Sequence, residues 1–303
     1  MEYGYYPGCS LHSTAKEFDQ SIKASFKALD VSLKEVPDWN CCGASSAHET
    51  SEDLALALSL RVLSQAERAN QKTVIAPCAA CYSRLKMANL EVAHDAVLKK
   101  RINQIIGQEY TGSVVVKHLV EIYKDNQDKL KASVAKPLTG LKVACYYGCL
   151  LARPKEVVDF DDAENPTTMD ELVTILGAQA LDWSHKTECC GASFSFSRLD
   201  IALRLVGDIL DAAKLAGADV ITVACPLCQA NLDMRQEMAA KRNKTTYNIP
   251  IIYISQLVGV AQGIKAKALG LDKHVVSGEK ILSNLKAPVP VPEKVEAAAA
   301  KLQ

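Results

Sequence analysis

Short apolar runs rich in β-branched and aromatic residues recur along the chain, and each is followed by a longer stretch with a helical spacing of apolar positions. The expected strands are residues 2–6, 31–36, 73–77, 142–147 and 219–224, and residues 113–123 and 249–261 each read as a strand followed by a helix. Strands that alternate with helices predict right-handed β-α-β crossovers and parallel sheets covered on both faces.

The helical stretches carry ordinary start signals. Residues 51–69 open with Ser51 as a plausible N-cap, have two acidic residues in the first turn and continue with an apolar stripe. A Lys-rich segment followed by AKPLTG separates the two halves of the chain near residues 136–140. We therefore expect an N-terminal unit over 1–138, a C-terminal unit over 139–286 and a Pro- and Ala-rich tail over 287–303.

The two halves repeat the same pattern of cysteines. Each half has a single Cys after Gly, then Cys-Cys-Gly, then Cys-x-x-Cys at the end of a strand. Flanking residues agree as well, since NCCGASS matches ECCGASF and YYPGCSL matches YYGCLL. The repeated cysteines are Cys9, Cys41, Cys42, Cys78 and Cys81 in the first half, and Cys149, Cys189, Cys190, Cys225 and Cys228 in the second.

Every repeated cysteine follows an expected strand. The carboxyl ends of parallel strands share one edge of a sheet, where open α/β folds place their ligands. The expected fold is therefore α/β, with two pseudo-symmetric Rossmann-like units that each gather five thiols. A helix that begins at each Cys-x-x-Cys would also favour negatively charged thiolates through its dipole.

Composition and charge exclude several classes of protein. Lys plus Arg and Asp plus Glu number 35 each, so there is no basic excess of the kind that nucleic-acid binders carry. We expect no nucleic-acid partner, no membrane span and, from the absence of a signal-peptide pattern, a cytoplasmic location. Neither a G-x-G-x-x-G nor a G-x-x-x-x-G-K-[ST] motif is present, which gives no basis for a flavin or nucleotide site.

Five converging thiols favour an iron–sulfur cluster over zinc. A structural zinc ion needs four cysteines, which would leave one thiol idle in each half. Adjacent side chains such as Cys41 and Cys42 point apart in extended backbone, so they suit different metals of one cluster, with Gly43 and Gly191 relieving the backbone beside each pair. The common ferredoxin spacing is absent, which indicates another type of cluster site.

With these motifs the chain resembles the CCG-domain proteins, most closely the B subunits of heterodisulfide reductases, from Tyr3 to about Gly263. The resemblance implies two noncubane [4Fe-4S] clusters, each held by one set of five cysteines. It further implies an oxidoreductase that reductively cleaves, or reversibly forms, a substrate disulfide between the two clusters. Each cluster would deliver one electron and capture one sulfur, which gives the duplication a purpose.

The same resemblance implies partners and leaves the substrate open. A ferredoxin-like C subunit and a flavin-containing A subunit would supply electrons, and the substrate would be a small-molecule or protein-bound disulfide such as the coenzyme M–coenzyme B heterodisulfide. The alternative function is a CCG-type electron-transfer component of a quinone-linked or 2-hydroxy-acid dehydrogenase. Such components often carry ferredoxin motifs or lack one cysteine set, whereas both sets are complete here. A zinc-stabilised scaffold is the third possibility.

A few other residues are candidates for smaller roles. His12 and His185 lie close in sequence to repeated cysteines and could donate protons to a leaving thiolate, although local hydrogen bonding is the commoner role for such residues. Arg153 could pair with an anionic substrate group. The tryptophans that precede each Cys-Cys pair, Trp39 and Trp183, read as core residues, and Cys145 reads as a small buried hydrophobe rather than a ligand.

Overall fold

The computed structural model describes residues 1–44 and 46–285 of the 303-residue chain, so the expected tail over 287–303 lies outside the described residues. The first half contains four strands, each followed by two helices. Its elements are β1 (Glu2–Tyr5), α1 (Gly8–His12), α2 (Lys16–Lys27), β2 (Ser32–Glu35), α3 (Ala47–Thr50), α4 (Glu52–Arg68), β3 (Thr73–Ile75), α5 (Ala79–His94), α6 (Ala96–Ile106), β4 (Val115–Lys117), α7 (Leu119–Asp125) and α8 (Gln127–Ala132).

The second half repeats this succession. Its elements are β5 (Lys142–Tyr146), α9 (Cys149–Ala152), α10 (Lys155–Val158), α11 (Thr168–Ile175), β6 (Gln179–Ala180), the 3-10 turn η1 (Ala192–Phe194), α12 (Leu199–Leu215), β7 (Val220–Val223), α13 (Pro226–Met234), α14 (Gln236–Asn243), β8 (Ile251–Tyr253), α15 (Ile254–Ala261), η2 (Ala266–Leu269), η3 (Leu271–Lys273) and α16 (Glu279–Ser283).

Each half forms a four-stranded, wholly parallel sheet with the same strand order. The orders are β2-β1-β3-β4 and β6-β5-β7-β8. The registers also correspond, since Tyr5 pairs with Ile75 in one sheet and Cys145 with Thr222 in the other. The predicted fold of two pseudo-symmetric Rossmann-like units is confirmed. In both sheets the strand order reverses direction between the first and third strands, which is where such folds bind ligands.

The inner strands of each sheet are buried, whereas the edge strand β2 is polar and largely exposed. All four residues of β7 are buried, as are the last four of β5. Helix α2 buries Phe18, Ile22 and Phe26, which recur at a helical spacing of four residues, and it leaves its charged face in solvent. The predicted cap of α4 is present, since the Ser51 hydroxyl accepts a hydrogen bond from the Leu54 amide at 3.4 Å.

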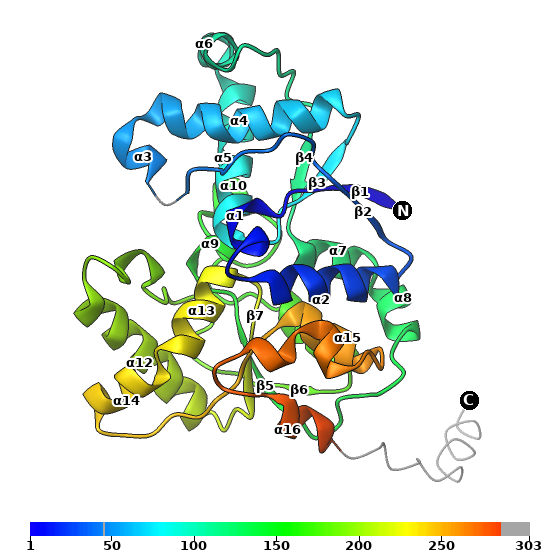
Figure 1. Ribbon diagram of the computed structural model, residues 1–303, viewed down its shortest axis with the longest axis vertical. Helices are drawn as coiled ribbons and strands as arrows, with labels where there is room; N and C mark the ends of the chain where they lie inside the picture. The colour runs from blue at the N-terminus through cyan, green and yellow to red at the C-terminus, as the bar shows by residue number, and fades with distance from the viewer. Residues whose placement is uncertain (45, 286–303) are drawn as a thin grey trace, which may run out of the picture.

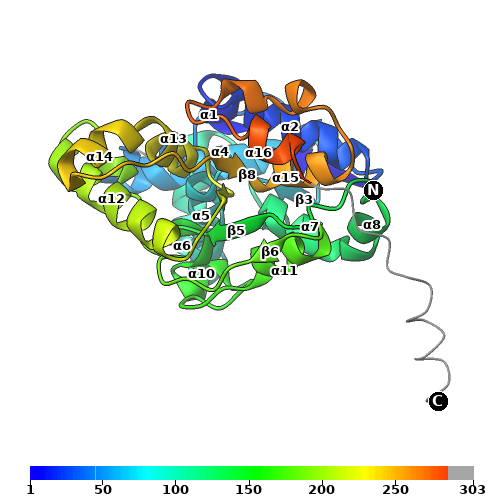
Figure 2. The same cartoon turned by 90° about the horizontal axis from the view of Figure 1, so that it is seen from below.

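The two halves pack against each other around one continuous core, and equivalent helices form equivalent contacts. Figure 1 shows α2 of the first half lying along α15 of the second, and Figure 2 shows the same pair from below. Helix α5 packs on α9 and, in the matching position, α13 packs on α1. At the α2–α15 contact the rings of Phe18 and Tyr253 stack 4.0 Å apart, and the Ser21 and Ser255 hydroxyls lie 2.7 Å apart.

Three local features were not predicted. The helical pattern after Cys81 is divided at Asp95, whose carboxylate accepts the amides of Val97 and Leu98 and starts a new helix. The pattern after Cys228 is divided at Arg235. Strand β6 has only two residues and no run of β-favouring residues in the sequence, so the sequence pattern does not predict it.

The expected junction between units, near residue 138, stays a prediction.

We predict that the two halves unfold together and that Phe18→Ala destabilises the whole chain by about 3–5 kcal/mol, because it leaves a cavity in a core that both halves share. Urea unfolding monitored by circular dichroism and by tryptophan fluorescence should give coincident single transitions. The control is Phe196→Ala, whose fully exposed ring should change the free energy of unfolding by less than about 0.5 kcal/mol. Two separated transitions would contradict a shared core.

Candidate metal centre

The first thiol set lies at the carboxyl edge of the β1–β4 sheet. Cys9 is in α1, directly after β1, and Cys41 and Cys42 are in the loop after β2. Cys78 is the N-cap of α5, after β3, and Cys81 lies in the first turn of that helix. The Cys42 and Cys81 sulfurs are 3.1 Å apart, and those of Cys41 and Cys9 are 3.9 Å apart. The parallel topology therefore brings all five thiols together, as the sequence predicts.

The second set repeats this arrangement in the β5–β8 sheet. Cys149 begins α9 and Cys225 is the N-cap of α13, with Pro226 at the first helical position. The Cys190 and Cys228 sulfurs are 3.7 Å apart, and Cys149 donates a hydrogen bond to Cys189. In each set three thiols are buried and two lie at or near the surface, which leaves one side of each set open.

The two sets meet at the interface between the halves. Cys78 and Cys225, which begin the two Cys-x-x-Cys segments, lie close enough for each thiol to shift the pKa of the other. That contact raises the pKa of Cys78 and, together with a stronger one from Cys228, lowers the pKa of Cys225. The ten thiols therefore form one connected group that spans both halves.

Two pairs of glycines make room for the thiols. Gly8 and Gly148 have φ of +65° and +67°, and a Cβ on either would lie 3.2 Å from the sulfur of Cys81 or Cys228 respectively. Gly43 and Gly191, both at φ +74°, point their amides at the preceding Cys41 and Cys189 sulfurs at 3.4 and 3.3 Å. A side chain at these positions would strain the backbone or enter the space that the thiols surround.

Two buried tyrosines hold the Cys-Cys-Gly loops, and sequence reasoning missed both. The Tyr6 hydroxyl donates to the Asn40 carbonyl at 2.8 Å, and the Tyr146 hydroxyl donates to the Glu188 carbonyl at 2.6 Å. Each carbonyl belongs to the residue directly before a Cys-Cys pair. Burial and the nearby cysteines raise the pKa of both tyrosines, so both hydroxyls stay protonated and able to donate. The repeated tyrosine three residues before Cys9 and Cys149 was the available signal.

Crowding determines the ionisation of the thiols. A hydrogen bond from Cys41, and a further one from Cys81, lowers the pKa of Cys42 to about 3. Cys149 in the same way lowers the pKa of Cys189 to about 6. The pKa values of the donors Cys41 and Cys149 are raised correspondingly. Thiols this close cannot all ionise unless a cation replaces their protons, which is the electrostatic condition for binding a thiophilic metal.

The donor set fits a cluster held by many thiolates. Every donor in each set is sulfur, the ligand that soft metals and iron–sulfur clusters prefer. Among residues 1–44 and 46–285, no three His, Cys, Asp or Glu side chains are arranged around one position for a single metal ion. All eleven cysteines are described, and all are free thiols.

The other predicted residues lie at the edges of this group or outside it. His12 follows Cys9 in α1, where its Nε2 is 3.3 Å from a Glu35 carboxylate oxygen and its ring packs against Trp39. Arg153 bonds to the Ala163 carbonyl, Glu164 and the Thr187 hydroxyl. Any catalytic role for these side chains stays a prediction.

His185 lies in a different environment from the thiols. Its Nδ1 is 2.8 Å from the Ser184 hydroxyl, and it lines a surface cavity of about 550 Å³ together with Trp183, Asp208 and Asp211. That cavity includes none of the cysteines. Trp183 and Cys145 are buried, and the Trp183 indole donates to the Cys145 carbonyl at 3.1 Å. Trp39 is partly buried against the core.

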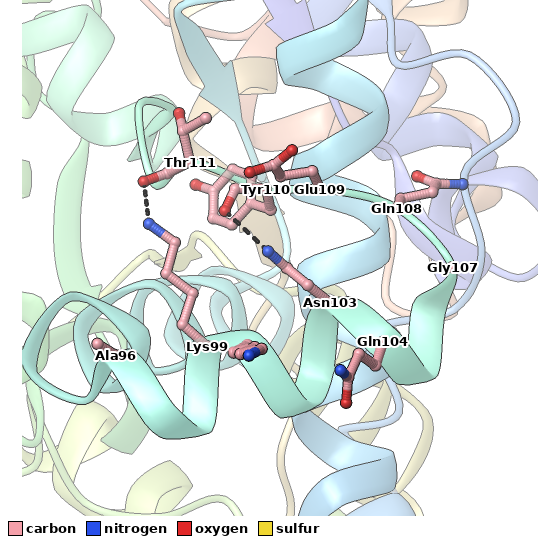
Figure 3. A pocket seen from close by; sticks show the side chains of 10 residues that line it. Ala96, Lys99, Asn103, Gln104, Gly107, Gln108, Glu109, Tyr110 and Thr111 are labelled. Atoms are coloured by element: carbon pink, nitrogen blue, oxygen red, sulfur yellow. Dashed lines mark hydrogen bonds between the residues drawn. The ribbon is translucent and has the colours of Figure 1, made fainter.

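The cavity drawn in Figure 3 is also remote from the thiol chemistry. It has a volume of about 550 Å³ and is lined by α6 and residues 107–111, with no cysteine among them. Its polar groups bond to one another, since Lys99 donates to the Thr111 carbonyl and Asn103 donates to the Tyr110 carbonyl at 3.3 Å. The candidate centre is therefore the thiol group and not this cavity.

Comparison with known proteins assigns the family. The model of the cysteine-rich domain termed CCG matches residues 3–86 and 143–233, and these two segments contain both complete thiol sets. The chain belongs to the CCG cysteine-rich domain family. As a CCG-domain protein it carries the domain twice, once in each parallel sheet.

Full-length relatives of this CCG-domain protein fall into two groups by name. It is 35% identical to the 8-methylmenaquinol:fumarate reductase membrane anchor subunit of Wolinella succinogenes, over 92% of this chain and 99% of that protein. It is 32% identical to the B subunit of the ferredoxin:CoB-CoM heterodisulfide reductase of Methanosarcina mazei, over 92% of this chain and 95% of that protein. No helix in the part of the chain that the structure describes is both long enough and apolar enough to cross a membrane.

A solved structure shows the same fold in a more distant chain. A hypothetical protein from Helicobacter pylori superposes with a TM-score of 0.72 at 14% sequence identity. The match covers 91% of this chain and 52% of that one, so the present chain spans about half the length of that protein. At this level of identity the likeness concerns the fold alone.

We predict that Cys189 is alkylated more readily than Cys41 near neutral pH in the metal-free chain. Its pKa of about 6 makes it largely thiolate above that pH, whereas Cys41 is also exposed but has a raised pKa. Iodoacetamide labelling followed by mass spectrometry from pH 5 to 8 should show Cys189 labelling increase through about pH 6. Cys149→Ala removes the hydrogen bond and should move that increase to higher pH. Equal labelling of Cys41 and Cys189 at pH 7 would contradict the pKa difference.

Proposed function

We propose that this chain is the iron–sulfur subunit of a heterodisulfide reductase-type complex, an oxidoreductase that acts on sulfur groups. The observation that carries the proposal is the pair of complete five-thiol sets that meet at Cys78 and Cys225. A simple electron carrier has no need for two equivalent, partly open sites that face a common boundary. Relatives named as B subunits of heterodisulfide reductases, at 32% and 31% identity over nearly the full length, support the same function.

Two noncubane [4Fe-4S] clusters are the proposed cofactors, each held by the five cysteines of one set. When bound, such clusters supply single electrons at a sulfur-rich site. The chain's part is to hold the ligands in place: Tyr6 and Tyr146 secure the Cys-Cys-Gly loops, while Gly8 and Gly148 keep the interior of each set clear. Gly43 and Gly191 add backbone amides that favour negative charge on sulfur.

Cleavage of a disulfide needs two electrons and two protons and gives two thiols. A substrate placed across the boundary of the halves would reach the open side of each set, where Cys9, Cys41, Cys149 and Cys189 are not fully buried. Electrons would come from a ferredoxin-like C subunit and a flavin-containing A subunit of the same complex. His12, which follows Cys9 by three residues in α1 and is partly exposed, is a proposed proton donor.

One observation favours a second candidate function. The relative that is 35% identical over 99% of its length is named a membrane anchor subunit of an 8-methylmenaquinol:fumarate reductase. On that basis the chain would relay electrons in a quinone-linked dehydrogenase without making or breaking S–S bonds. Both functions use the same thiol sets, so they differ in whether substrate sulfur interacts with the site.

The test is the metal content and thiol response of anaerobically purified protein. We expect about eight irons and eight acid-labile sulfides per chain, with little zinc. We also expect an electron paramagnetic resonance signal that changes when coenzyme M is added. Eight irons without any thiol response would favour the electron-transfer function, and zinc without iron would overturn both.

We predict that Cys41→Ser and Cys190→Ser each lower the iron content from about eight to about four per chain and abolish disulfide reduction. Each variant removes one thiol from one set and leaves the other set intact. The matched control is Cys145→Ser, a fully buried cysteine outside both sets, which should keep its iron. Full reductase activity in either set variant would contradict a mechanism that needs both sites.

A further inference from the structure

The ring of His118 joins the two halves at the point where their Cys-x-x-Cys segments begin. His118 caps α7 at the end of β4 and is completely buried. Its Nε2 lies 2.8 Å from the Pro77 carbonyl oxygen in its own half and 3.1 Å from the Ala224 carbonyl oxygen in the other half. Pro77 directly precedes Cys78, and Ala224 directly precedes Cys225.

The contacts of the ring establish which nitrogen carries the proton. The Val120 amide donates to Nδ1 at 3.3 Å, so Nδ1 is the acceptor and Nε2 bears the hydrogen. Burial lowers the pKa of His118 to about 4, and the ring is therefore neutral at physiological pH. A single N–H is thus shared between two carbonyl oxygens from different halves.

Those two carbonyls are equivalent positions of the repeat. Pro77 and Ala224 each precede the first cysteine of a Cys-x-x-Cys, so a hydrogen bond donor between their carbonyl oxygens makes the same contact with both halves. Only the first half supplies this donor, which is His118. The matching N-cap in the second half is Tyr253, which instead stacks on Phe18. The backbone caps are nevertheless the same, since Glu121 accepts the His118 amide at 2.7 Å and Gln256 accepts the Tyr253 amide at 3.0 Å.

We propose that His118 is a positioning residue that fixes the separation and orientation of the two thiol sets by bridging their Cys-x-x-Cys segments with one shared hydrogen bond donor. The geometric part of this inference concerns the metal-free chain. Its consequence for two interacting clusters rests on the proposed function.

Two substitutions distinguish a bridging role of His118 from a role in packing or helix capping alone. An asparagine at position 118 carries an oxygen close to the place of Nδ1, where it can still accept the Val120 amide, but it has no donor at the place of Nε2. A glutamine is long enough to put an amide N–H near the place of Nε2. His118→Asn therefore removes the bridge while retaining the cap, and His118→Gln retains the bridge.

The first readout is independent of bound metal. Mild oxidation of the metal-free chain should form a Cys78–Cys225 disulfide across the interface and a Cys42–Cys81 disulfide within the first half, where the sulfurs are 3.1 Å apart. Mass spectrometry gives the ratio of the two. We expect the ratio of the Cys78–Cys225 disulfide to the Cys42–Cys81 disulfide to be roughly fivefold lower in His118→Asn, which is the effect expected when one orienting hydrogen bond is lost. In His118→Gln the ratio should stay near the wild-type value.

Tyr253→Phe is the matched control, because it alters the equivalent position of the other half without touching the bridge. Its disulfide ratio should equal that of the wild type. An unchanged ratio in His118→Asn, an equal loss in Tyr253→Phe, or a loss in His118→Gln as large as in the asparagine variant would overturn the proposal. If His118→Asn does not fold, the glutamine variant decides: a wild-type ratio supports the bridge and a lowered ratio overturns it.

The second readout uses the metal-loaded protein. At equal iron content, the magnetic interaction between two reduced clusters should change in His118→Asn and be retained in His118→Gln and Tyr253→Phe. A wild-type chain that binds no iron would refute the proposed function but would leave the disulfide ratios as a separate test of the bridge. An unaltered interaction in His118→Asn would overturn the bridge while leaving the proposed function intact.

Discussion

The parallel direction of the strands is the constraint on which this structure depends. Because every strand in a sheet runs the same way, the loop or helix that follows each strand emerges at one edge, and a cysteine in that segment has to meet the others. Cys9, Cys42 and Cys81 are far apart in sequence and converge for this reason alone. The close approach then demands glycine at Gly8 and Gly148, where any Cβ would press on a thiol of the neighbouring strand.

Bringing ten thiols together affects the ionisation of the thiols and of the tyrosines beside them. Hydrogen bonds to neighbouring thiols, together with burial, raise the pKa of thiols such as Cys41 and Cys81, and the favoured thiolates, such as Cys42, depend on neighbouring thiols that donate to them. The tyrosines beside each set contribute hydroxyl dipoles and apolar rings without adding charge, because their pKa values are raised. The region is therefore rich in sulfur, poor in counter-charge and well suited to a positively charged metal core.

Much of the fold could be predicted from sequence, because the apolar runs of the strands and the spacing of the cysteines are local patterns. The parallel topology then brings the cysteines that follow different strands close together. Seven of the eight strands found among the described residues correspond to predicted runs, and the exception, β6, is two residues long and has no pattern to detect. The sequence pattern does not predict a new helix after Asp95, because the helical spacing of apolar residues continues across this position. Tyr6 and His118 could not be assigned, since their partners are backbone carbonyls that only the folded chain brings within reach.

Duplication made the two thiol sets alike, but it did not make their surroundings alike. Next to Cys9 and Cys81 the first half has Ser10 and the buried Ala80, whereas the second half has Leu150 and Leu227 at the same places, 39% and 45% exposed. Apolar groups beside a metal site exclude water and lower the local dielectric, which shifts the potential of whatever the thiols bind. If the two sets hold the proposed clusters, their unequal surroundings would give the clusters unequal redox potentials. A disulfide placed across the halves, as proposed, would meet a more polar rim at the first set and a more apolar rim at the second.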